Sequence, residues 1–203
     1  SRGLGDVYKR QIYNKVSVFP AFGETVTSDA VFYIDDLNYT EAAANSDFCP
    51  GFSCVTFSEA EAKLADFGGL GVDVVSDTAD PTNTVAKLIK LSTSQPWAGV
   101  TISVGSSDNT VNRIDPAQGI SLRVFSPVAG EKFMVKIENG SDGNINSEAE
   151  AFTTKTNAWE TLLFTYPQAN SAAKYNKVSI FPAFGSAPDR VYFVDDLKYT
   201  VKN

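Results

Sequence analysis

The chain has 203 residues, of which 43% are hydrophobic and none is histidine, and its 17 Lys and Arg against 24 Asp and Glu give a formal net charge of −7. Without histidine, the chain can build neither a Ser-His-Asp nor a Cys-His catalytic group, nor a metal site with His ligands. The acidic balance argues against nucleic acid as a partner, and no run approaches the roughly 18 apolar residues of a membrane helix.

The first eleven residues, 1–11, match nothing further along the chain. They resemble the translated adapter sequence that marks the ends of reading frames assembled from environmental DNA, so we exclude them from the fold. On this interpretation the native N-terminus, with any signal peptide, lies upstream of the sequence.

One segment occurs twice, at residues 13–40 and 175–200, and the two copies agree at ten of their first eleven positions. Repeats this far apart are typical of whole domains joined in tandem. We therefore expect residues 12–40 to be the C-terminal hairpin of a truncated upstream repeat and residues 55–203 to be one complete module. Residues 41–54 would be the linker, and neighbouring modules would belong to a larger parent protein.

The linker holds both cysteines, in the run Cys49-Pro50-Gly51-Phe52-Ser53-Cys54. A Pro-Gly pair is typical of the middle of a type II turn, which would bring the two sulfur atoms together. A disulfide in so small a loop favours an extracellular or periplasmic protein, with two free thiols as the alternative.

Alternation of apolar and polar residues with a period of two predicts an all-β module. Only residues 59–65 suggest a helical turn. Many short strands in about 150 residues favour two packed antiparallel sheets, a β-sandwich of the jelly-roll type. The expected strands are 55–57, 71–75, 84–91, 98–104, 120–126, 132–138, 149–154, 160–166, 177–181 and 191–199.

The same alternation separates inward-facing from outward-facing residues. The expected core includes Val100, Ile102, Val104, Ile120, Leu122, Val124, Phe133, Val135, Ile137, Val178 and Ile180. Aromatic, charged and hydroxyl side chains lie opposite them. Such a mixture suits a sugar, because a ring covers its C–H face and polar groups bind its hydroxyls. The alternative is a half-solvated sheet face with scattered aromatic residues.

The two tryptophans have different expected roles. Trp97 follows Ser94-Gln95-Pro96 at the start of a strand and is the better candidate for stacking on a sugar, with a place in the core as the alternative. Trp159 opens the run WETLLF, in which Leu162 and Phe164 are expected to be buried, so we expect it in the core or at a sheet edge.

Several motifs occur in a family-specific order: 66–69 (DFGG), 84–91 leading to 97–99 (WAG), 123–127 (RVFSP), 129–130 (AG), 136–138 (KIE), 157–162 (NAWETL) and 192–197 (YFVDDL). This order resembles the galactose-binding-like jelly-roll carbohydrate-binding modules, similar to families 4, 9 and 22. It is most similar to the tandem modules of secreted polysaccharide-utilisation proteins of marine Bacteroidetes. The resemblance covers residues 55–200.

The resemblance implies a non-catalytic module that binds a polysaccharide, often a β-glucan such as laminarin, and targets a secreted or cell-surface protein to it. For the binding residues we expect aromatic and polar side chains on the outer sheet face: Trp97, Arg123, Phe125, Lys136, Glu138 and Phe181.

Modules of this type commonly hold a structural Ca²⁺, through an acidic residue near the first strand and an aspartate in the last. The matching residues are Glu59 with Asp195 or Asp196, whose carboxylate oxygens suit Ca²⁺. Alternation places Asp195 on the same side as Phe193, which is expected in the core, so it needs a metal or hydrogen-bond donors. Ser58 stands where the family often has an acid. The alternative is that the two aspartates bond backbone amides at a strand end.

Two other functions compete with sugar binding. A sandwich-fold glycosidase needs two carboxylates across a cleft, and the candidates are Glu148 with Glu150 or Glu59 with Glu61, neither pair in a recognisable catalytic motif. A structural spacer or adhesin repeat needs no ligand. We expect the outer-face residues to converge on one site if the module binds, and to be scattered or paired with each other if it is a spacer.

Overall fold

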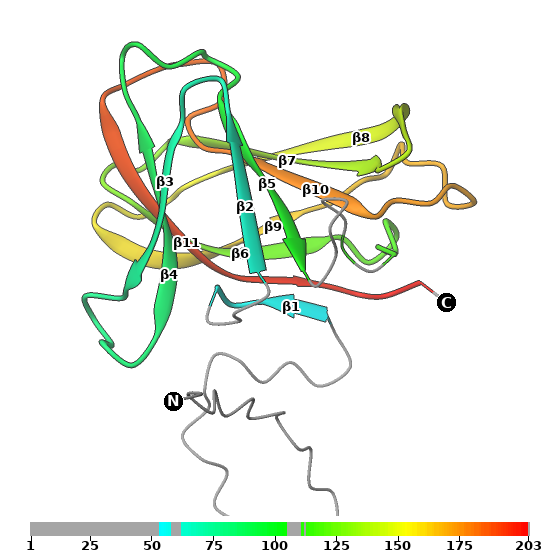
Figure 1. Ribbon diagram of the computed structural model, residues 1–203, viewed down its shortest axis with the longest axis horizontal. Helices are drawn as coiled ribbons and strands as arrows, with labels where there is room; N and C mark the ends of the chain where they lie inside the picture. Colours follow the sequence, from blue (N-terminus) through cyan, green and yellow to red (C-terminus); the bar gives the residue numbers. More distant parts are fainter. Residues whose placement is uncertain (1–52, 58–61, 105–110, 112, 203) are drawn as a thin grey trace, which may run out of the picture. The chain divides into compact units, whose positions relative to one another are not determined.

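The computed structural model describes residues 53–57, 62–104, 111 and 113–202 (Figure 1). Two antiparallel sheets account for all its named strands, which confirms the predicted all-β sandwich. The expected extra N-terminal segment (1–11), the truncated repeat (12–40), most of the linker and Glu59 lie outside the described residues. Within the described part of the chain, no helix is long and apolar enough to cross a membrane.

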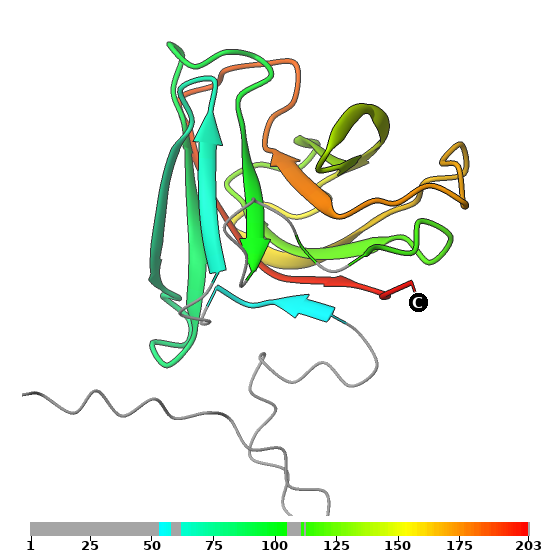
Figure 2. The same ribbon diagram turned by 45° about the vertical axis from the view of Figure 1, so that its right-hand side comes forward.

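The first sheet has the strand order β3-β4-β11-β6-β9, and β1 pairs with β11 as well. Strand β11, drawn in red, pairs with β4 along its first half and with β1 along its last residues, and both views show this (Figures 1 and 2). The strands are β1 (Ser53–Val55), β3 (Gly71–Ser76), β4 (Thr84–Lys90), β6 (Ile120–Ser126), β9 (Ala158–Phe164) and β11 (Arg190–Tyr199).

The second sheet has the order β2-β5-β10-β7-β8. Its strands are β2 (Ala62–Phe67), β5 (Gly99–Val104), β7 (Lys132–Asn139), β8 (Asp142–Phe152) and β10 (Lys177–Phe181). The repeated segment at 175–200 thus supplies β10 to this sheet and β11 to the first, and each of these strands lies inside its sheet.

The core lies between the sheets. Ten of the apolar residues predicted to face inward are fully buried, because one apolar face from each sheet excludes water. They are Val100, Ile102, Ile120, Leu122, Val124, Phe133, Val135, Ile137, Val178 and Ile180, each 0% exposed.

The helical turn expected at 59–65 is wrong over its described part. Residues 62–67 form β2, which pairs with β5 along its whole length. Its Leu64 packs on the core while Lys63 and Ala65 point outward, so the short run has the period of a strand. The strand expected at 149–154 begins earlier, at Asp142, because β7 and β8 form a long hairpin.

A β-bulge in β11 reverses which residues face the core. Asp195 pairs with Arg123 and Lys198 pairs with the residue two positions earlier on β6, so β11 has one extra residue, with Asp196 at φ 48°. Before the bulge Phe193 and Asp195 point away from the core; after it Leu197 is buried inside. The prediction that Phe193 and Asp195 share the core side with Leu197 is therefore wrong.

Candidate functional site

The six predicted binding residues lie on two different sheets. Arg123 and Phe125 belong to β6 of the first sheet, whereas the other four border or belong to the second. Alternation indicates which side of its own sheet a residue occupies, but not which sheet a strand joins. The expected single group is therefore divided. The four residues on the second sheet are Trp97, just before β5, Lys136 and Glu138 on β7, and Phe181 on β10.

Four aromatic rings follow one another along the outer face of the second sheet, and we call them the aromatic row: Trp97, Phe67, Phe181 and Phe184. Trp97 lies nearly parallel to Phe67, with ring centroids 6.3 Å apart and an interplanar angle of 19°. Phe181 meets Phe67 edge to face at 5.4 Å and Phe184 at 5.8 Å. Trp97 is 52% exposed, Phe67 and Phe184 are half-buried and Phe181 is 8% exposed, so the row offers one accessible ring supported by less exposed ones.

Gly99 allows this close packing of rings. It pairs with Phe67 across the β2–β5 ladder. A Cβ atom at Gly99 would lie 2.8 Å from Phe67 Cζ and 2.9 Å from Phe181 Cδ1. A residue with any side chain would therefore separate the rings, and the glycine lets the row continue across β5.

Hydroxyl groups lie next to the aromatic row. Thr101 and Ser179 pair across β5 and β10, and their side-chain oxygens are 2.8 Å apart. Both residues are buried, at 8% and 2% exposed, and one hydroxyl donates to the other. The pair lies between the aromatic row and the charged residues of β7, because Ser179 faces Lys136 across the β10–β7 ladder.

The charged side chains of this face pair with one another. Glu138 accepts both Lys136 at 3.1 Å and Lys177 at 3.2 Å, and Lys136 also lies 3.9 Å from Glu148. Nearby, Lys132 lies 3.1 Å from Glu150. The carboxylates considered for a glycosidase, on β8, are thus engaged by lysines of β7.

Arg123 and Phe125 instead join a cluster on the outer face of the first sheet. The Arg123 guanidinium carbon lies 4.1 Å from the ring centroid of Trp159. Phe125 meets Trp159 edge to face at 5.7 Å and Phe193 at 5.8 Å. Trp159 is half-buried on this outer face rather than inside the sandwich. These rings stabilise each other and Arg123, and they are not part of the aromatic row.

Asp195, the first predicted calcium ligand, is fully buried under the segment before β4. Its Oδ2 accepts from Asn83 Nδ2 at 2.9 Å and from Arg123 Nη1 at 3.1 Å, and its Oδ1 accepts from the Asp196 amide at 2.8 Å. Burial raises the pKa of Asp195 to about 6, which Asn83 and Arg123 oppose. The hydrogen bond from the Asp196 amide is of the kind expected in the alternative for the Asp-Asp pair, but it lies at the bulge within β11 rather than at a strand end.

These partners do not fit a calcium ion at Asp195. A guanidinium on the same oxygen repels a second cation, and an amide nitrogen is not a ligand for Ca²⁺. Within the described residues, no three acidic or cysteine side chains gather as a metal site would require. Glu59, the other predicted ligand, lies outside the described residues, so the calcium site stays a prediction.

Cys54 is disulfide-bonded. It lies in β1, where it pairs with Lys198 of β11. Its predicted partner, Cys49, lies outside the described residues.

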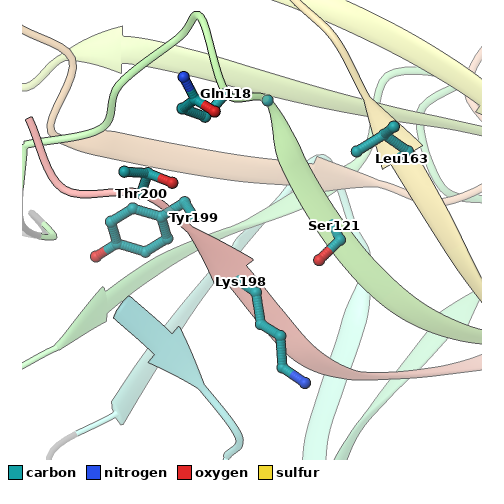
Figure 3. A pocket seen from close by; sticks show the side chains of 7 residues that line it. Gln118, Ser121, Leu163, Lys198, Tyr199 and Thr200 are labelled. Atoms are coloured by element: carbon teal, nitrogen blue, oxygen red, sulfur yellow. The ribbon is translucent and has the colours of Figure 1, made fainter. Parts of the chain in front are cut away.

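A pocket of about 230 Å³ lies on the first sheet, away from the aromatic row (Figure 3). Leu163, Ser121 and Lys198 line it from three neighbouring strands, together with Gln118, Gly119, Tyr199 and Thr200. It contains none of the predicted binding residues. Its exposed apolar side chain is Leu163, and its one aromatic ring, Tyr199, is 3% exposed and offers little stacking surface.

Sequence reasoning missed Phe67, Phe184 and Gly99 as parts of the site. Phe67 follows the segment expected to be helical, and Phe184 lies in a turn, where alternation gives no direction. The signal for Phe184 was available in the repeat, since the Phe-Pro-Ala-Phe-Gly run occurs in both copies.

No family model and no curated protein matches the chain. Among solved structures, it is similar to the CBM22-1 and GH10 modules of endo-1,4-β-D-xylanase 10B from Clostridium thermocellum in complex with xylohexaose. The TM-score is 0.51 at 15% identity, over 76% of this chain and 29% of that one. The chain thus spans less than a third of that two-module structure.

Two further solved structures are similar. One is the family 11 carbohydrate-binding module of Clostridium thermocellum with a β-1,3-1,4-mixed-linked tetrasaccharide (TM-score 0.49, 12% identity, 74% of this chain and 96% of that one). The other is the K1 adhesin domain of Lys-gingipain from Porphyromonas gingivalis (TM-score 0.48, 12% identity, 75% and 99%). Modules of families 22, 27 and 29 are also among the similar structures. The likeness to the xylanase modules, with a TM-score above 0.5, agrees with the predicted jelly-roll fold.

Proposed function

We propose that this chain is a non-catalytic carbohydrate-binding module that binds a polysaccharide on the outer face of its second sheet. The aromatic row is the observation that carries the proposal. It places an accessible indole on the same sheet face as the charged side chains of β7, with the buried Thr101–Ser179 hydroxyl pair between the row and those charges, so that one face offers both a stacking surface and hydrogen-bonding groups.

The preferred ligand in this proposal is a β-glucan of the laminarin type, and the module would target a secreted or cell-surface parent protein to it. The choice of glycan rests on the resemblance of the sequence motifs. The extracellular location is supported by the disulfide at Cys54, since disulfides persist in oxidising compartments.

Affinity electrophoresis tests the proposal. The protein is run in native gels that contain laminarin, mixed-linkage glucan, xylan, mannan or alginate. We expect retardation on laminarin or another single polymer class. Trp97→Ala should abolish most of it, while Leu163→Ala, which removes an exposed apolar side chain from the first sheet, should not. Equal loss in both variants, or retention in Trp97→Ala, would place binding elsewhere.

A structural spacer is the second candidate. The ion pairs of Glu138 with Lys136 and Lys177 favour it, because charges engaged with each other offer less to a ligand. Arg123 is likewise held by Asp195 and Trp159. Absence of retardation on every polymer would support the spacer, and release of reducing sugar from a chromogenic β-glucan would indicate an enzyme instead.

A further inference from the structure

Lys90 is a lysine buried at the end of β4, on the core side of the first sheet. Its exposed fraction is 0%. A buried ammonium is costly unless hydrogen bonds replace its lost hydration. Here Nζ donates to three backbone carbonyls: those of Pro96 at 2.9 Å, Pro182 at 2.9 Å and Ala183 at 3.3 Å. All three ammonium protons therefore have an acceptor.

The acceptors belong to the two loops that border the aromatic row. One carbonyl lies in the β4–β5 loop, directly before Trp97. The other two lie in the turn between β10 and β11, directly before Phe184. The carbonyl of Pro96 also accepts from the Gly185 amide at 3.1 Å, so the two loops contact each other. A single side chain of the first sheet thus holds two loops that shape the face of the second.

Three groups determine the electrostatics around Lys90. Glu131 is buried nearby and favours the charged form of Lys90. Its Oε2 accepts from Arg190 Nη1 at 2.5 Å and from the Tyr192 hydroxyl at 2.7 Å. Burial lowers the pKa of Lys90 to about 8 and Glu131 opposes this shift. Hydrogen bonds to Glu131 raise the pKa of Arg190, and burial raises that of Tyr192, so both keep their protons near pH 8.

We propose that Lys90 is a positioning residue of the carbohydrate-binding face, whose ammonium holds the two loops so that Trp97 and Phe184 line up with Phe181. This inference rests on the proposed function. Ala183, at φ 46° and 1% exposed, adopts a backbone conformation that a non-glycine residue keeps only when its surroundings hold it. The bond from Lys90 to its carbonyl is one such constraint.

The test compares Lys90→Met with Lys87→Met, which removes an outward-facing lysine three residues earlier on the same strand. Both are made in a Trp159→Phe background, so that Trp97 is the sole tryptophan. We expect Lys90→Met to weaken retardation at least tenfold and to change the quenching of Trp97 fluorescence by acrylamide. Lys87→Met should change neither. Wild-type quenching and affinity in Lys90→Met would overturn the proposal.

The pH profile gives a second test that needs no folded Lys90→Met. In the Trp159→Phe protein, the affinity for the polymer should fall as the pH rises, because Lys90 loses its proton. The quenching of Trp97 should change over the same range, and both changes should have a midpoint near pH 8. The pKa of Lys90 is lowered from 10.5 to about 8, so between pH 8 and pH 10.5 the unfolded chain binds the Lys90 proton more tightly than the folded protein does. The contribution of Lys90 to the unfolding free energy therefore rises with pH in this range. A loss of binding as the pH rises cannot then be explained by this residue destabilising the fold.

The outcomes separate the two proposals. If no polymer retards the Trp159→Phe protein but the quenching of Trp97 still changes in Lys90→Met and with pH, the proposed function fails while the positioning role stands. If the polymer binds with no change in affinity or quenching across pH 7–9.5, the positioning role of Lys90 fails alone.

Discussion

Gly99 provides a sharp test of the aromatic row, because the structure gives the consequence of adding one methyl group. In Gly99→Ala the new Cβ would lie 2.7 Å from the carbonyl oxygen of Ile180, besides its contacts with Phe67 and Phe181. Rings can rotate away, but the carbonyl belongs to the β5–β10 ladder and cannot move without breaking it. Overpacking of this kind costs roughly 1–3 kcal/mol.

Part of that cost is offset, since replacing glycine in a strand recovers about 0.5–1 kcal/mol. The expected net destabilisation is about 1–2 kcal/mol, which lowers the Tm of a domain of this size by about 2–8 °C. The control is Gly143→Ala on β8, where the nearest atom to the added Cβ is Glu138 Oε1 at 3.9 Å.

Differential scanning fluorimetry measures the Tm, and affinity electrophoresis well below the Tm measures binding. Gly99→Ala should lower both the Tm and the retardation, whereas Gly143→Ala should leave the retardation unchanged and raise the Tm by about 1–4 °C, because it recovers the strand entropy without a clash. A Gly99→Ala protein with wild-type Tm and retardation would show that the rings are not packed as described.

Three further predictions concern the first sheet. Burial raises the pKa of Asp195 from 3.8 to about 6, so between these pH values the folded protein binds a proton here that the unfolded chain does not. The contribution of this carboxyl to the unfolding free energy should therefore rise as the pH falls from 6 towards 4. Urea unfolding of wild type and Asp195→Asn at pH 7 and pH 5 measures this contribution, and a difference between the two proteins that does not change with pH would contradict the raised pKa of Asp195. Arg123→Ala should lower the unfolding free energy by about 1–3 kcal/mol, because it leaves a buried carboxylate without its cation, yet preserve retardation; lost binding with unchanged stability would return Arg123 to the site. EDTA should leave the Tm unchanged, and a Tm that rises on adding Ca²⁺ would show that a calcium site exists.

The sandwich could be predicted from the sequence because burial is periodic. Every strand with a clear alternation, such as Ile120-Ser121-Leu122-Arg123-Val124, buries the expected face. The failures occur where the period is interrupted. The bulge at Asp196 adds one residue and exchanges the two faces of β11, which no local pattern announces. Strand β2 was missed because its small apolar side chains are compatible with both a helix and a strand.

The candidate site could be predicted only in part because it depends on pairing between distant strands. Phe67, Gly99 and Phe181 come together through β2, β5 and β10, which are separated in the chain and adjacent in the sheet. The residue types suited to sugar binding were identifiable, but their division between two sheets was not. Lys90 could not be found at all, since its role depends on three carbonyls that carry no sequence signal.

The two indole N–H groups offer the most direct test of the central claim, because Trp97 borders the second sheet and Trp159 lies on the outer face of the first. In ¹H–¹⁵N NMR spectra, each tryptophan gives one indole signal, assigned with Trp97→Phe and Trp159→Phe. During titration with laminarin oligosaccharides, and with those of the other polymers in the panel, we predict that the Trp97 signal shifts for at least one of them while the Trp159 signal does not. Movement of the Trp159 signal alone, or of neither signal with any oligosaccharide, would contradict a binding face on the second sheet.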